Sequence, residues 1–182
     1  MMSTSAKQRP DGSGRRATLV CGLGSSHGDD QLGWRVAERL APAAGSAASI
    51  RAAGSPADLL DWLDGIDRLI VCDACQNLGS PGALHRWRWP DVPGELLRRL
   101  GVHDLGLADV LALADQLRRL PAETIIFGVE IEACLPGTPC SASAAEAADR
   151  LAETIARELG CCERTPPYQP TAGGVRACSQ SR

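Results

Sequence analysis

The strongest constraint on the fold is the stretch 17–40, ATLVCGLGSSHGDDQLGWRVAERL. The apolar run at 17–22 predicts a buried β-strand, and the apolar residues at 32, 36, 37 and 40 have the spacing of an amphipathic helix. A turn of small residues joins the two and ends in an acidic pair, Asp29 and Asp30. Turns that follow parallel strands lie at the carboxyl edge of a sheet, where ligands bind. This unit therefore predicts carboxylates at a ligand-binding edge.

The rest of the chain alternates predicted strands with predicted helices. The run DRLIVCD at 67–73 is continuously apolar at its centre, which is typical of a strand covered on both faces. The alternation at 83–89 instead predicts a half-exposed edge strand. We predict an α/β three-layer sandwich, with a twisted, mostly parallel sheet of about five strands and helices on both faces. Further strands are expected at 48–53 and 123–131, and further helices after Ser55, at 105–120 and at 143–159.

Two helix starts carry the pattern of a capping box. In this pattern, a serine side chain and an acidic side chain three residues later satisfy free backbone N–H groups. Ser55 and Asp58 fit it, with Pro56 at the first helical position. Ser143 and Glu146 fit it for the last helix, which we expect to stop at Gly160.

Composition narrows the class of protein. We expect one domain over 17–160, between a disordered leader at 1–16 and a disordered tail at 161–182. The net charge of −3 and the scattered arginines give no reason to expect nucleic acid or a membrane as partner. The leader lacks the apolar segment of a secretory signal. The eight cysteines are spread along the chain, so we expect reduced thiols and a cytoplasmic location. We also expect a monomer.

The glycine-rich turn allows two other interpretations. Glycines at 22, 24 and 28 suggest a dinucleotide-binding loop, but the third glycine comes one residue late, and two carboxylates there would repel a pyrophosphate. Alternatively, one aspartate caps the following helix, as acidic side chains at helix N-termini often do. A cap needs only one of the pair.

Three residues form a candidate metal site. Asp30 lies in the turn after the first strand, Asp73 at the end of the central strand, and His103 just before a later helix. Two carboxylates and an imidazole at one edge of a sheet suit a divalent transition metal with open coordination positions. The alternatives are that Asp73 is a turn or capping residue and that His103 is a solvated or capping residue.

The other histidines and the cysteines carry weaker signals. We interpret His85 as an edge residue and His27 as a minor candidate beside the acidic pair. Cys72 and Cys75 form a C-x-x-C pattern, which can indicate a redox or zinc site. Strand alternation points Cys72 away from Asp73, and no second such pair completes a zinc site. We therefore interpret the cysteines as structural.

At these residues the chain resembles the hydrogenase maturation endopeptidases, which trim the C-terminus of the large subunit of nickel–iron hydrogenases. The resemblance covers roughly 17–160, and its HDLGLADVL block is the most specific part. The sequence differs from many members at Ser25 and at Gly54-Ser55. The matching segments are LVCGLGSSHGDDQLGWRVAERL, LIVCDACQNLGSPGALHRW, HDLGLADVLALA and TIIFGVEIE.

The resemblance implies an endopeptidase whose partner is the precursor of a hydrogenase large subunit. It also implies that Asp30, Asp73 and His103 contact nickel already delivered into that precursor, so that the substrate supplies the metal and no organic cofactor is needed. Asp29 or a ligand carboxylate is then a possible catalytic base. The same residues would serve a chaperone that checks nickel loading without cutting.

Overall fold

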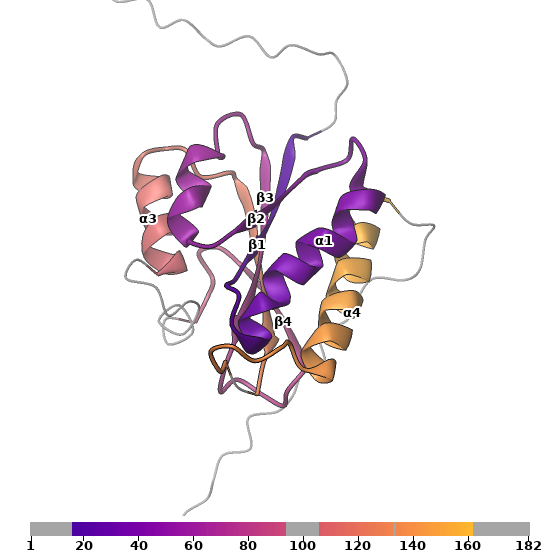
Figure 1. Cartoon of the computed structure of the whole chain (residues 1–182). Coiled ribbons are helices and arrows are strands. Elements are labelled where there is room, and N and C mark those ends of the chain that lie inside the picture. Colours follow the sequence, from indigo (N-terminus) through magenta and orange to yellow (C-terminus); the bar gives the residue numbers. More distant parts are fainter. Residues whose placement is uncertain (1–15, 94–105, 133, 162–182) are drawn as a thin grey trace, which may run out of the picture.

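The computed structural model describes residues 16–93, 106–132 and 134–161 (Figure 1). Its core is a five-stranded sheet in the order β2-β1-β3-β5-β4. β1, β2, β3 and β5 run parallel, and β4 pairs antiparallel with β5 at one edge. The mostly parallel sheet and its half-exposed edge strand are as predicted. The strands are β1 Thr18–Leu23, β2 Ser49–Ala53, β3 Arg68–Cys75, β4 Leu84–Arg88 and β5 Glu123–Glu130.

Helices cover both faces of the sheet and complete the predicted three layers. The helices α1 Leu32–Ala44 and α4 Ala142–Glu158 lie together on one face (Figure 1). The 3-10 helix η2, Pro56–Asp61, and α3, Leu107–Gln116, cover the other. A second 3-10 helix, η1 Gly28–Gln31, precedes α1. α1 and α4 begin at the lower end of Figure 1, where the parallel strands end.

Alternation along β3 divides the interior into two apolar cores. Ile70 and Cys72 belong to the core beneath α1 and α4. Leu69 and Val71 belong to the core beneath η2 and α3. The continuous apolar run in the sequence therefore serves both faces of one strand. Cys72 points away from the face that carries Asp73, as the alternation predicted.

Gly22 and Gly33 let α1 approach the sheet closely. A Cβ atom on Gly22 would collide with the backbone carbonyl of Gly33, and one on Gly33 would collide with the carbonyl of Leu23. Because neither position has room for a side chain, Gly22 is accounted for by helix–sheet packing. The turn needs no nucleotide phosphate to explain this glycine.

Several predicted boundaries are corrected. β3 continues two residues beyond Asp73, because Asp73, Ala74 and Cys75 pair with β5. The capping box of Ser55 and Asp58 is confirmed, but it opens a short 3-10 helix.

The predicted box at Ser143 is wrong, because the N-cap of α4 is Ser141. Arg16, at the end of the predicted leader, forms an ion pair with Glu123. The rest of the leader and the tail beyond Cys161 lie outside the described residues.

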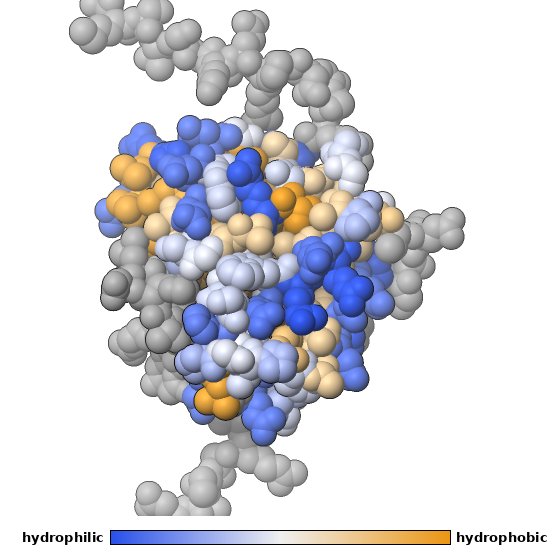
Figure 2. Space-filling model, viewed as in Figure 1, coloured by the Kyte–Doolittle hydropathy of each residue, from blue (hydrophilic) through white to orange (hydrophobic). Residues whose placement is uncertain are grey.

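The face of the molecule in Figure 2 carries both hydrophilic and apolar groups of residues. In Figure 2 hydrophilic residues gather over α1, and apolar residues gather over the outer part of α3, where Leu113 and Leu117 are exposed. Over the described ranges, no helix combines the length and the apolar character needed to cross a membrane.

Candidate functional site

Asp73 is buried within β3 near the carboxyl edge of the sheet. Its side chain is 4% exposed, and its residue pairs with Gly128 of β5. The backbone N–H of Ala74 donates a hydrogen bond of 2.8 Å to Asp73 Oδ1. No lysine or arginine among the described residues forms an ion pair with this carboxylate. Asp73 is thus an acidic group held in a low-dielectric setting without a described counter-charge.

This setting changes the proton affinity of Asp73. The pKa of its carboxyl group is raised from 3.8 to about 7, chiefly because an ionised carboxylate is poorly solvated in this buried position. The neighbouring carboxylate of Asp30 contributes to this rise in the pKa, and the Ala74 N–H opposes it. Perturbed carboxyl groups of this kind gather at functional sites.

Asp30 reaches the same place from η1. The loop after β1 folds tightly, because the backbone N–H of Ser25 donates to the Asp30 carbonyl at 3.3 Å. A Cβ atom on Gly24 would collide with that carbonyl, so Gly24 is required by the turn itself. The Asp30 side chain is half-buried and close enough to Asp73 to raise the pKa of Asp73. The structure therefore brings two of the three predicted site residues together.

Asp29 has a different environment from Asp30. It is buried, and its carboxylate accepts hydrogen bonds from the Ser141 backbone N–H at 2.6 Å and from Ser141 Oγ at 3.0 Å. Ser141 is the N-cap of α4. Asp29 therefore anchors the start of a helix 112 residues away, where a negative charge is favoured by the helix dipole. The expectation that one aspartate of the pair caps the following helix is wrong, because neither η1 nor α1 has a side-chain cap, and Asp29 instead holds the N-cap residue of α4.

The two histidine predictions near this edge have different outcomes. His103 lies outside the described residues, so its place as third ligand stays a prediction. His27 is exposed, and its Nδ1 lies 3.1 Å from Ser25 Oγ. The carbonyl of His27 accepts a hydrogen bond from Cys134 Sγ at 3.3 Å.

A second cluster near this edge was not predicted. Cys75, His85 and Glu130 each place one ligand atom within 4.8 Å of the others. Sequence analysis interpreted Cys75 as structural and His85 as an edge residue, and it gave Glu130 no role. Their proximity depends on the pairing of β3, β5 and β4, which no local spacing in the sequence reports.

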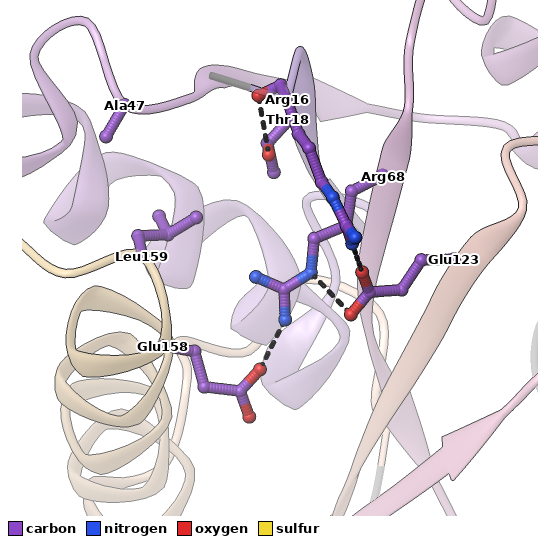
Figure 3. Close-up of a pocket in the computed structure, with 7 residues that line it drawn as sticks. All are labelled: Arg16, Thr18, Ala47, Arg68, Glu123, Glu158 and Leu159. Carbon is purple, nitrogen blue, oxygen red and sulfur yellow. Dashed lines mark hydrogen bonds and ion pairs between the residues drawn. The ribbon is translucent and has the colours of Figure 1, made fainter. Parts of the chain in front are cut away.

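The opposite edge of the sheet holds a surface hollow of about 370 Å³. There, Arg68 forms ion pairs with Glu123 at 3.1 Å and with Glu158 at 2.7 Å (Figure 3). Arg16 also pairs with Glu123, at 2.8 Å. Since this hollow lies at the strand starts and its charges are paired, we interpret it as structural and place the candidate site at the carboxyl edge.

Comparisons of sequence identify related proteins. The family model for hydrogenase maturation protease matches residues 35–158, a range that includes Asp73 and His103 and begins after Asp30. The hydrogenase expression/formation protein HupD of Rhodobacter capsulatus is 31% identical over 122 residues, which make up 63% of this chain and 58% of that protein. The chain thus spans little more than half the length of this curated relative.

Solved structures share the fold. An endopeptidase from Escherichia coli is 28% identical, with a TM-score of 0.68 over 79% of this chain and 94% of that chain. The hydrogenase maturating endopeptidase HybD from E. coli is 24% identical, with a TM-score of 0.67 over 79% and 92%. Since the family model covers more than half of the residues, the chain belongs to the hydrogenase maturation protease family.

Proposed function

We propose that this protein is an endopeptidase that removes a C-terminal peptide from the nickel-loaded large subunit of a nickel–iron hydrogenase. The observation that carries the proposal is the convergence of Asp30 and Asp73 at the carboxyl edge of the sheet, in a chain of the hydrogenase maturation protease family. The precursor of the large subunit is the proposed partner.

In this proposal Asp30, Asp73 and His103 contact the nickel that the substrate carries. Carboxylate oxygens and imidazole nitrogens are suitable ligands for a borderline divalent metal. The buried Asp73 carboxylate has no described cation beside it, and a metal in the substrate would supply one. Only a precursor that already holds nickel would then be positioned for cleavage, which makes the metal a recognition element.

The proposed reaction is hydrolysis of one peptide bond. The oxygen of a water molecule bonds to the scissile carbonyl carbon, the C–N bond breaks, and the proton reaches the departing amine. A carboxylate must accept the proton of that water. Asp29 is held by two hydrogen bonds from Ser141, which favours Asp30 or Asp73 for this role. In the free protein, before substrate and its metal arrive, the pKa of Asp73 is about 7.

The test measures the intact mass of a matched large-subunit precursor, loaded with nickel or free of it, before and after incubation with the protein. Loss of a short C-terminal peptide from the nickel-loaded precursor alone is the expected result. Asp30→Asn and Asp73→Asn should leave the precursor uncut, whereas Asp29→Asn should still cut it. An unchanged mass with the wild-type protein would instead favour the chaperone that checks nickel without cutting. Normal processing by both Asp30→Asn and Asp73→Asn would refute the proposed site.

A further inference from the structure

Cys75, His85 and Glu130 share one face of the sheet. Cys75 and Glu130 are partners in the parallel pairing of β3 with β5, and His85 faces Gly128 in the antiparallel pairing of β4 with β5. Residues two apart on a strand point to the same side, so these three side chains and Asp73 lie on the same face. Their ligand atoms lie within 4.8 Å of one another.

The space between the three ligands depends on Gly128. A Cβ atom there would come within 2.7 Å of the Trp87 ring and 3.0 Å of Cys75 Sγ. Trp87 in turn stacks on His85, with ring centroids 5.3 Å apart and planes 13° from parallel. The missing side chain admits the indole, and the indole holds the imidazole in place. The ring of His85 is therefore oriented by packing before any ligand arrives.

The polar atoms of this cluster are incompletely satisfied. Glu130 is 3% exposed and accepts hydrogen bonds from the Leu78 N–H at 3.0 Å and from Cys75 Sγ at 3.8 Å. His85 Nε2 is buried without a hydrogen-bond partner in the described part of the chain. No ion pair joins Glu130 to a described lysine or arginine. A buried carboxylate beside an unpartnered imidazole nitrogen is a costly arrangement that a bound cation would relieve.

We propose that Cys75, His85 and Glu130 bind a divalent transition metal of the zinc class. Thiolate, imidazole and carboxylate are all ligands of Zn²⁺, and three protein ligands leave one tetrahedral position open. A thiolate ligand disfavours Mg²⁺ and Ca²⁺, which prefer oxygen. The site lies about 7 Å along β3 from Asp73, given the rise of two strand residues. It is thus distinct from the proposed contact with substrate-borne nickel.

The test uses the full chain, stripped of metal with a chelator and then titrated with Co²⁺, whose thiolate complexes absorb in the near ultraviolet. One equivalent should produce the thiolate-to-cobalt band, and Zn²⁺ should abolish it by displacement, since Zn²⁺ follows Co²⁺ in the usual affinity order. Mg²⁺ should have no effect. The absence of a band would overturn the proposal.

Variants assign the ligands. Cys75→Ser should remove the band. His85→Gln and Glu130→Gln should weaken Co²⁺ binding by more than the roughly 10- to 100-fold that loss of an outer-shell partner costs. Should Cys75→Ser fail to fold, His85→Gln on the half-exposed edge strand still tests the site, with circular dichroism as the check on folding.

Matched controls separate this site from other sources of metal binding. Cys134→Ser and the double variant Cys161→Ser/Cys162→Ser should keep the band, since these cysteines are not among the three ligands. Asp30→Asn should keep it too, which separates the two sites. A band that survives His85→Gln and Glu130→Gln at unchanged affinity, or that disappears with Cys161 and Cys162, would overturn the proposal.

Discussion

The carboxylates at the two edges of the sheet differ in how their charge is compensated. At the amino edge, Arg68 lies between Glu123 and Glu158 and forms ion pairs with both (Figure 3). At the carboxyl edge, Asp73 and Glu130 are more deeply buried, yet neither forms an ion pair with a described lysine or arginine. Arginines of the chain compensate the carboxylates at the amino edge. At the carboxyl edge, a cation from outside the described part of the chain would be needed.

We infer from this difference that the amino edge serves stability and the carboxyl edge serves function. Paired charges at the strand starts join β3, β5 and α4 and need no ligand. An uncompensated buried carboxylate destabilises the folded state, and proteins retain such groups where a ligand or reaction uses them. The unpaired carboxylates at the carboxyl edge should therefore lower the stability of the folded protein. The following substitutions test this inference.

The largest expected effect is the loss of processing in Asp73→Asn. The carboxamide keeps the size of the side chain but removes the charge proposed to contact substrate-borne nickel. We expect the rate of precursor cleavage to fall by about 1,000-fold or more, equivalent to about 4 kcal/mol in the activation barrier. Time courses of intact precursor mass measure this rate. Glu123→Gln at the amino edge is the matched control, and its rate should match that of the wild type.

The same substitution should stabilise the free protein. A carboxyl group whose pKa rises from 3.8 to about 7 on folding contributes most stability below pH 4, and this contribution is lost as the pH rises to 7. Asp73→Asn lacks this loss, so its advantage should grow from pH 4 to 7 and then level off, on the order of 4 kcal/mol.

Denaturant unfolding of both proteins across this pH range measures the difference. A variant that is less stable than the wild type at pH 8 would show that Asp73 is compensated after all. The proposed difference between a compensated amino edge and an uncompensated carboxyl edge would then be wrong.

Removing the ion pairs at the amino edge should have the opposite effects to Asp73→Asn: lower stability and unchanged processing. Arg68→Met removes the cation that Glu123 and Glu158 share, and the Arg68 side chain is only 13% exposed. Glu123 then keeps only Arg16, and Glu158 only Arg86, as an ion-pair partner among the described residues. We expect a loss of about 2 kcal/mol, between the values for exposed and buried pairs. Processing of the precursor at 25 °C should be unchanged. Glu158→Gln should cost less, because Arg68 keeps its contact with Glu123.

How well the sequence predicted each site depended on how many strands have to be placed to bring its residues together. The convergence of Asp30 and Asp73 followed from parallel topology, because both come late in neighbouring strands or just after them. The cluster of Cys75, His85 and Glu130 could not be foreseen, since it requires the register of three strands, one of them antiparallel.

Helix caps likewise could be predicted only where the capping contact is local in the sequence. The box at Ser55 and Asp58 is local, and sequence analysis placed it correctly. At α4 the local pattern pointed to Ser143, but Ser141 is the N-cap, and its N–H is held by Asp29. A contact between residues 112 positions apart therefore accompanies the actual start of the helix.

Asp29 provides the smallest and most selective test, because it stands next to Asp30 in the chain. In Asp29→Asn the side-chain oxygen can still accept the Ser141 N–H, but the negative charge at the start of α4 is lost. We expect a cost of about 1 kcal/mol in the free energy of unfolding, the usual size of a cap or helix-dipole effect. Cleavage of the nickel-loaded precursor should persist, whereas Asp30→Asn should abolish it with little change in stability. Loss of cleavage in Asp29→Asn at intact stability would move the catalytic base to Asp29 and give the acidic pair a joint role in the reaction.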